Sequence, residues 1–159
     1  YVSAGESHLL LTGTEKELGL EVALKSGGYY PGYVFQHCEG RGLEDEEVVC
    51  VGDLYLKTII TPGHSLASAC FLLSGGGKNA LFSGDTVMMN GMIGLLNCPG
   101  FSMDMYRDVT AKKLSQMEPQ ELFPGHMMFI LKNGKEHLKK AVDNLSHIGV
   151  PSHIGKCWE

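Results

Sequence analysis

The feature that most constrains the fold of this chain is a series of four short apolar segments between residues 47 and 85. The stretch 47–61 (EVVCVGDLYLKTIIT) divides at Gly52 and Asp53, and the stretch 68–85 (SACFLLSGGGKNALFSGD) divides at three glycines. Such breaks are typical of hairpin turns, because glycine adopts left-handed backbone conformations without a steric penalty. Four strands joined in succession by short turns predict an antiparallel meander.

Helical patterns precede and follow these strands. A capping box at Thr14 and Glu17 predicts the start of the first helix, and Ser102 suits the start of the second. The predicted helices cover residues 14–27, 102–117 and 133–149, and a further short strand is expected within 119–126. Strands followed by interleaved helices indicate an α+β domain with an antiparallel-rich sheet and flanking helices.

The composition limits the classes of function. The chain has 159 residues, enough for one domain with a core, and a formal net charge of −5 with scattered lysines and arginines, which argues against a nucleic-acid partner. No apolar run approaches the ~20 residues of a membrane span. We therefore expect a soluble, cytoplasmic protein without a membrane partner. The five cysteines include no CxxC pair, and Cys50 and Cys70 are expected in the core.

The stretch TPGHS at residues 61–65 admits two interpretations. Ser65 lies in a near match to the G-x-S-x-G turn of serine hydrolases, with Asp85 and His126 following in a suitable chain order. That turn requires a helix after the serine, whereas the residues after Ser65 have a strand-like pattern, and Ala67 replaces the second glycine. The alternative is that His64 is the working residue.

Three motifs share one design that favours the histidine. IITPGH, ALFSGD and ELFPGH each join an apolar strand to a glycine turn and then to His64, Asp85 or His126. Strand ends at one edge of a sheet converge, and glycine permits a close approach of the backbone. Imidazole nitrogens and a carboxylate suit Zn²⁺, one ion or two, with iron or manganese as alternatives.

The motifs TPGHS, LFSGDT and FPGH, in this order and spacing, resemble the third to fifth motifs of the metallo-β-lactamase fold superfamily, which includes glyoxalase II-like hydrolases and lactonases. The resemblance is strongest over residues 47–148 of a single, incomplete domain at 1–159. It implies an αββα sandwich, of which this chain is the C-terminal part. It also implies that His64 binds a first metal ion, His126 binds a second, and Asp85 bridges the two.

The chain departs from the family in one respect, because the HxHxDH motif with its three histidines is missing. His8 stands alone and is predicted to lie on a helix surface. The chain is therefore expected to be the C-terminal portion of a longer protein and to hold half of each metal shell. We predict that by itself it binds metal poorly and shows little or no hydrolase activity.

The resemblance implies a mechanism for the full-length protein. The ions act as Lewis acids and lower the pKa of a bound water from ~15.7 to about 7, giving a hydroxide nucleophile that the catalytic residue Asp85 helps to hold. Ser65 is then expected to donate a hydrogen bond beside the site or to cap its turn. In family members the stretch matching 87–101 borders the site, but methionine-rich apolar residues are more often core residues. The expected substrate is a small ester, thioester or lactone. A non-catalytic relative with a vestigial site, an iron-dependent sulfur dioxygenase-like protein, and a homo-dimer remain open.

Overall fold

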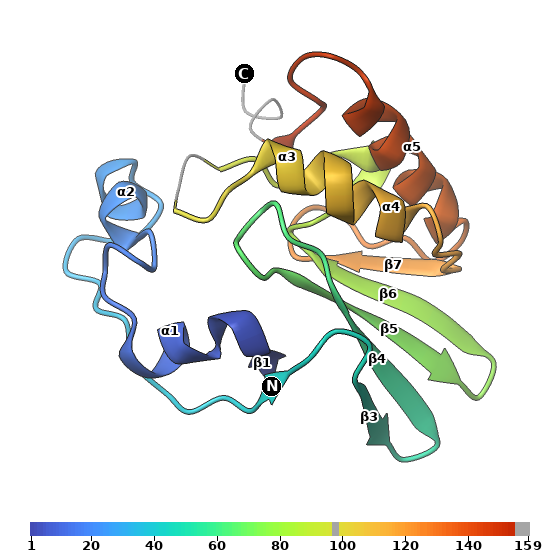
Figure 1. Ribbon diagram of the computed structural model, residues 1–159, viewed down its shortest axis with the longest axis horizontal. Helices are drawn as coiled ribbons and strands as arrows, with labels where there is room; N and C mark the ends of the chain where they lie inside the picture. Colours follow the sequence, from blue (N-terminus) through green and yellow to red (C-terminus); the bar gives the residue numbers. More distant parts are fainter. Residues whose placement is uncertain (97–98, 155–159) are drawn as a thin grey trace.

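A computed structural model describes residues 1–96 and 99–154 of the chain; residues 97 and 98, in the stretch expected to border the site, and residues 155–159, including Cys157, lie outside the described part. A five-stranded sheet forms its centre, in the order β3-β4-β5-β6-β7 (Figure 1). The strands are β3 (Val48–Val51), β4 (Leu54–Ile60), β5 (Ala69–Gly75), β6 (Lys78–Gly84) and β7 (Glu121–Pro124). The first four pair antiparallel, as predicted, and β7 is parallel to β6.

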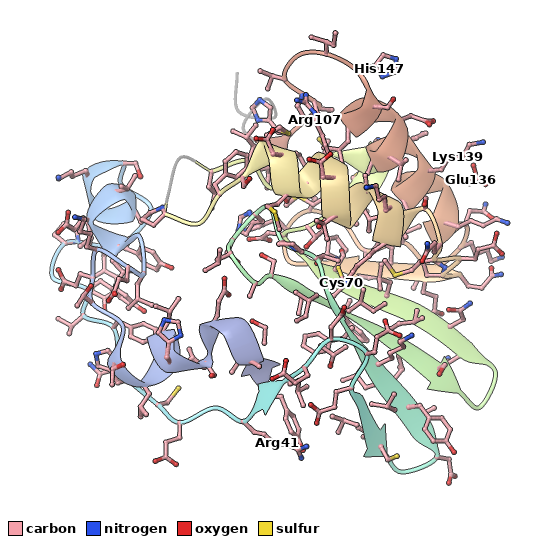
Figure 2. The ribbon with its side chains drawn as sticks, in the orientation of Figure 1. Arg41, Cys70, Arg107, Glu136, Lys139 and His147 are labelled. Atoms are coloured by element: carbon pink, nitrogen blue, oxygen red, sulfur yellow. The ribbon has the colours of Figure 1, made fainter. Side chains whose placement is uncertain are left out.

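One face of this sheet packs against two helices to form the main core. Helices α4 (Ala111–Leu114) and α5 (Gly134–Ser146) lie together on this side (Figure 1). Residues from four strands and both helices meet here with Val87, which follows β6: Ile59, Cys70, Leu81, Leu114, Leu122, Leu138 and Ala141. Cys70 is buried among them, as expected (Figure 2). Cys50 is exposed, so its predicted place in the core is wrong, because β3 is an edge strand.

The opposite face of the sheet carries a row of aromatic side chains. Phe71, Phe82 and Phe123 are register partners across β5, β6 and β7, one position from the core residues Leu81 and Leu122. Side chains alternate between the two faces of a strand, so the three rings point away from the helices. The rings of Phe82 and Phe123 stack with centroids 5.1 Å apart, and Phe82 is 40% exposed.

The predicted helix at 102–117 is present in three short pieces, α3 (Met103–Met105), a π-helical turn η3 (Tyr106–Thr110) and α4. Ser102 caps it as expected, since its Oγ accepts a hydrogen bond from the Met105 N–H at 3.2 Å. Arg107 donates to the carbonyl oxygens of Leu145, His147 and Gly149. These bonds tie the end of α5 to η3 (Figure 2).

The N-terminal part forms a smaller unit beside the sheet (Figure 1). It contains β1 (Val2–Ser3), η1 (Ala4–Glu6), α1 (Ser7–Thr12), α2 (Leu20–Lys25) and β2 (Gly42–Leu43). A further 3-10 turn, η2 (Met89–Gly91), lies between β6 and α3. Strands β1 and β2 pair in parallel, and the Glu6 carboxylate accepts the Ala67 N–H at 2.9 Å, which joins this unit to the turn after β4. His8 is exposed on α1, as predicted.

The capping box forms, but it does not start the helix. The Thr14 N–H donates to the Glu17 carboxylate at 2.8 Å, and the Glu17 N–H donates to Thr14 Oγ1 at 3.3 Å. These bonds close a turn, and α2 begins only at Leu20, after Gly19 in a left-handed conformation. The predicted start at residue 14 is therefore wrong.

In the described part of the chain, none of the helices has the length and apolarity that crossing a bilayer requires.

Candidate metal centre

The three residues singled out by their motifs meet at one edge of the sheet. Strands β4, β6 and β7 run in the same direction, because β4 and β6 are both antiparallel to β5 and β7 is parallel to β6. Their C-terminal ends therefore share an edge, and His64, Asp85 and His126 follow these ends. Asp85 Oδ2 lies 3.4 Å from His64 Nε2 and 3.6 Å from His126 Nε2.

A hydrogen bond fixes the orientation of His64. Its Nδ1 lies 2.8 Å from the carbonyl oxygen of Gly94. A carbonyl can only accept, so His64 donates this bond from Nδ1, and Nε2 is the ring nitrogen that faces Asp85. The His64 side chain is only 17% exposed, whereas that of His126 is 59% exposed. This orientation is the one in which His64 would offer Nε2 to a metal ion beside the Asp85 carboxylate.

Glycines without side chains allow the backbone to approach these groups. A Cβ on Gly125 would lie 2.5 Å from Asp85 Oδ1, and a Cβ on Gly94 would lie 2.7 Å from His64 Nδ1. The Gly125 N–H also donates to the Gly84 carbonyl at 2.7 Å, which holds the end of β7 against the end of β6. The motif glycine Gly125 thus has the expected role, while Gly94 lies outside the motifs and could not be found from them.

Ser65 closes its own turn. Its Oγ lies 2.5 Å from Ser68 Oγ, and its N–H donates to the same Ser68 oxygen at 2.9 Å. Strand β5 follows, as the sequence suggested, so the helix that supports a serine nucleophile is not present after this turn.

The donor atoms suit zinc, but they do not form a complete shell. Two atoms bound to one tetrahedral zinc ion at ~2.1 Å would lie about 3.4 Å apart, similar to both distances at Asp85. Within residues 1–96 and 99–154, however, no group of three or more histidine, cysteine, aspartate or glutamate side chains is arranged so that it could hold a metal ion. The two pairs centred on Asp85 have the chemistry and spacing of part of a coordination shell.

Tyr106 lies directly behind the site, which the sequence did not indicate. It is fully buried, and its hydroxyl oxygen is 3.4 Å from each of the carbonyl oxygens of Asp85, Thr86 and Gly94. Burial, together with the nearby Cys70 and Asp85, raises the pKa of this hydroxyl well above its ordinary value, so it stays protonated and can donate. Helical spacing alone would place Tyr106 in the core without revealing these partners.

His137 has a partner as well. Its charged neighbours in the sequence predict an exposed position for His137 on α5. In the structure the side chain is half-buried, and its Nδ1 accepts the Asn90 N–H at 2.7 Å. Burial and the neighbouring Lys140 lower the pKa of His137, and Glu136 opposes this shift. The bond fastens the turn η2, between Asp85 and Gly94, to α5.

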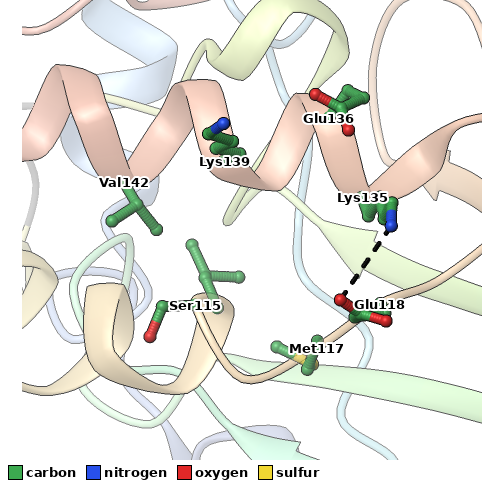
Figure 3. A pocket seen from close by; sticks show the side chains of 8 residues that line it. Ser115, Met117, Glu118, Lys135, Glu136, Lys139 and Val142 are labelled. Atoms are coloured by element: carbon green, nitrogen blue, oxygen red, sulfur yellow. Dashed lines mark ion pairs between the residues drawn. The ribbon is translucent and has the colours of Figure 1, made fainter.

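A cavity of about 480 Å³ opens beside His64. Its walls come from the N-terminal unit and from the turns after β4 and before α3, and the lining includes Leu9, Leu10, Leu18, Leu66, Leu96 and Pro99. A second hollow of about 300 Å³ lies between α4 and α5, where Lys135 and Glu118 form an ion pair at 3.9 Å (Figure 3). Only the first cavity includes one of the three site residues.

Curated relatives of the chain include hydrolases. It is 35% identical over 85 residues to a probable polyketide biosynthesis zinc-dependent hydrolase, BaeB, of Bacillus velezensis, a match that covers 53% of this chain and 36% of that protein. It is 25% identical over 103 residues to an atrochrysone carboxyl ACP thioesterase of Aspergillus fumigatus, covering 65% of this chain and 30% of that protein. The matches thus span about a third of these relatives.

The fold is that of a known class of protein. The metallo-β-lactamase superfamily protein ST1585 of Sulfolobus tokodaii superposes with a TM-score of 0.61 at 20% identity, over 94% of this chain and 60% of that structure. No family model matches the chain. The architecture is therefore a metallo-β-lactamase fold. The fold is the one that the three motifs indicated, and the match to BaeB includes a stretch of the same chain.

Proposed function

We propose that this chain is part of a zinc-dependent hydrolase that acts on an ester, thioester or lactone. The observation that carries the proposal is the meeting of His64, Asp85 and His126, with both Nε2 atoms within 3.6 Å of one carboxylate oxygen. The relatives support it, since one is described as a zinc-dependent hydrolase and another as a thioesterase of an acyl carrier protein.

Each of the three residues has a distinct role in this proposal. His64 would hold one ion through Nε2, His126 would hold a second through Nε2, and the Asp85 carboxylate, within 3.6 Å of both nitrogens, would contribute to holding them. Zinc supplies Lewis acidity and a water that is acidic enough to act as a nucleophile near neutral pH. Asp85 is the catalytic residue of this chain, because its carboxylate can also accept a hydrogen bond from the attacking water. Iron or manganese would suit the same donors.

The cavity beside His64 suits the acyl part of a small-molecule substrate. Its lining is dominated by leucine side chains, so it would gain free energy by taking up an apolar group. Glu6 and Glu17 on its wall disfavour a negatively charged one. The proposed substrate therefore has an apolar, uncharged acyl group whose carbonyl carbon reaches the edge at His64.

The remaining metal ligands are proposed to come from residues outside this chain. The relatives are about three times as long as the stretch they share with it, and the described part contains no complete metal cluster. We expect the 159-residue chain alone to bind zinc weakly and to hydrolyse little. One tight stoichiometric zinc site in calorimetry of this chain would contradict that expectation.

The test uses the longer, full-length protein that this proposal implies. Zinc-loaded protein is assayed against acyl thioesters, aryl esters and acyl lactones, before and after removal of metal by a chelator. We expect chelation or Asp85→Asn to abolish hydrolysis, and Asp53→Asn, in the turn between β3 and β4, to leave it unchanged. Hydrolysis that survives both treatments would refute the proposal. Inactivity toward all three classes would favour a non-catalytic relative, and iron as the main bound metal would favour the dioxygenase-like alternative.

A further inference from the structure

The side chain of Tyr106 connects the backbone segments that carry two of the proposed ligands. Its ring packs under the turn that presents His64, since a Cβ on Gly63 would lie 2.5 Å from the ring. Its hydroxyl reaches the carbonyl oxygens of Asp85, Thr86 and Gly94, all at 3.4 Å. The residues it contacts come from the turn after β4, from the segment after β6 and from the stretch after η2, so one side chain touches three separate parts of the site.

The Gly94 peptide forms hydrogen bonds with both His64 and Asp85, in addition to its contact with Tyr106. Its carbonyl oxygen faces both Tyr106 and His64 Nδ1, the latter at 2.8 Å, and its N–H donates to the Asp85 carbonyl at 2.9 Å. A carbonyl has two lone pairs and can accept from the phenol and from the imidazole at once. The Tyr106 hydroxyl, the Gly94 peptide and the His64 ring thus form a short hydrogen-bonded chain that ends at Asp85.

The burial of Tyr106 strengthens the hydrogen bonds of this chain. The residue is fully buried, and hydrogen bonds shielded from water are stronger electrostatically than exposed ones. Without the Tyr106 hydroxyl, the Gly94 carbonyl would be able to turn toward other donors, and His64 Nδ1 would then lose its acceptor. A His64 ring protonated on Nε2 would present a hydrogen atom to Asp85 where a metal ion requires a lone pair.

We propose that Tyr106 is a positioning residue that fixes the Gly94 carbonyl and so holds the His64 ring with its Nδ1–H on that carbonyl and its Nε2 toward Asp85. The proposal rests on the proposed function for the role of His64 as a ligand. The competing explanation is that Tyr106 only fills the second core cluster with Ile93 and Leu145. The two explanations differ in what the hydroxyl does, because phenylalanine would fill the same space.

The test compares Tyr106→Phe with Tyr55→Phe, an exposed tyrosine of β4, in the 159-residue chain. Nitrogen-15 NMR of the histidine rings reports which ring nitrogen carries the proton. We expect His64 in the wild type and in Tyr55→Phe to be protonated mainly on Nδ1, and Tyr106→Phe to show an increased share of the Nε2-protonated form. In the full-length protein, Tyr106→Phe should weaken zinc binding about 10-fold or more, as loss of an outer contact to a ligand does.

Unchanged His64 ring shifts in a folded Tyr106→Phe variant would overturn the proposal. If that variant fails to fold, the wild-type hydroxyl proton decides: a donor held in this buried chain should exchange slowly with water and give its own signal, and fast exchange would count against it. Neither measurement depends on catalysis. An inactive full-length protein would therefore refute the proposed function and leave the result for Tyr106 intact.

Discussion

At the residue scale, the closeness of the backbone to Asp85 governs the candidate metal centre. Gly125 follows β7, and its missing side chain leaves room for Asp85 Oδ1. Its φ is not in the left-handed region, so the backbone itself tolerates alanine at this position. The need for glycine is thus steric, with the carboxylate as the nearest neighbour and the Gly84 carbonyl carbon next, at 3.3 Å.

Gly125→Ala should therefore damage the site more than the fold. The added methyl would lie 2.5 Å from Asp85 Oδ1 and would push the carboxylate away from the two imidazoles. We expect zinc affinity of the full-length protein to fall about 10- to 100-fold, measured by competition with a chelator. Gly28→Ala, in the N-terminal unit, is the matched control and should leave zinc binding unchanged. Equal affinities of the two variants would show that Asp85 is not positioned in this way.

His137 introduces a pH dependence at the same scale. Its pKa in the folded state is lowered, chiefly by burial, so the unfolded state binds more protons at pH values between the two pKa values. The stabilisation is therefore complete above the unfolded value of 6.5 and is lost as the pH falls through the folded pKa. Protonation also removes the acceptor for the Asn90 N–H, a bond worth about 1 kcal/mol.

His137→Asn keeps an acceptor near the position of Nδ1 but does not titrate. We expect the free energy of unfolding, from urea denaturation at pH 7.5 and 5.5, to fall less with acid in this variant than in the wild type. His147→Asn, at the exposed end of the same helix, should behave like the wild type. A wild-type acid response in His137→Asn would mean that other groups cause it.

At the element scale, the short parallel strand β7 completes the site. It brings His126 beside β6, and its side chain Leu122 is fully buried in the main core. Leu122→Ala should lower the free energy of unfolding by about 2–5 kcal/mol, because it leaves a cavity between the sheet and the helices. Leu131→Ala, at an exposed leucine nearby, should cost less than about 1 kcal/mol in the same urea denaturation.

The elements also show which parts of the structure were accessible from the sequence. The meander was predictable because alternating strands and glycine turns are local signals, and Gly52 and Gly77 do adopt the left-handed conformations that their hairpins need. The start of α2 was not, because the capping box forms at Thr14 and Glu17 but Gly19, in a left-handed conformation, separates it from the helix. The local pattern of Thr14 and Glu17 predicted the two hydrogen bonds correctly, but it did not predict that they close a turn instead of starting a helix.

The candidate site divides in the same way. His64, Asp85 and His126 could be found because each follows a strand, and strands of one direction end at one edge. Gly94, Tyr106 and His137 could not, since their contacts join residues far apart in sequence and carry no motif. Tyr106 lies on a helical pattern, which predicts burial but not its three carbonyl partners.

At the scale of the whole molecule, the helices cover one face of the sheet and leave aromatic rings on the other. We call Phe71, Phe82, Phe123 and Phe129 the aromatic face; the rings of Phe123 and Phe129 lie 6.0 Å apart, and Phe129 is 61% exposed. Exposed apolar patches of this kind bind apolar partners or dyes in water. The patch adjoins the site, because Gly84 and Gly125 line the same hollow as Phe82 and Phe123.

The folded chain should therefore bind the fluorescent dye ANS through the aromatic face. Phe82→Thr combined with Phe129→Ser removes two of its most exposed rings, and we expect the dye fluorescence to fall by about half or more. The cost in stability should be small, since both side chains are already partly in water. Tyr30→Ser, at an exposed ring of the N-terminal unit, should leave the fluorescence unchanged. If this control lowers the signal as much as the double variant, the dye binds elsewhere and the sheet face is less accessible than its exposed rings indicate.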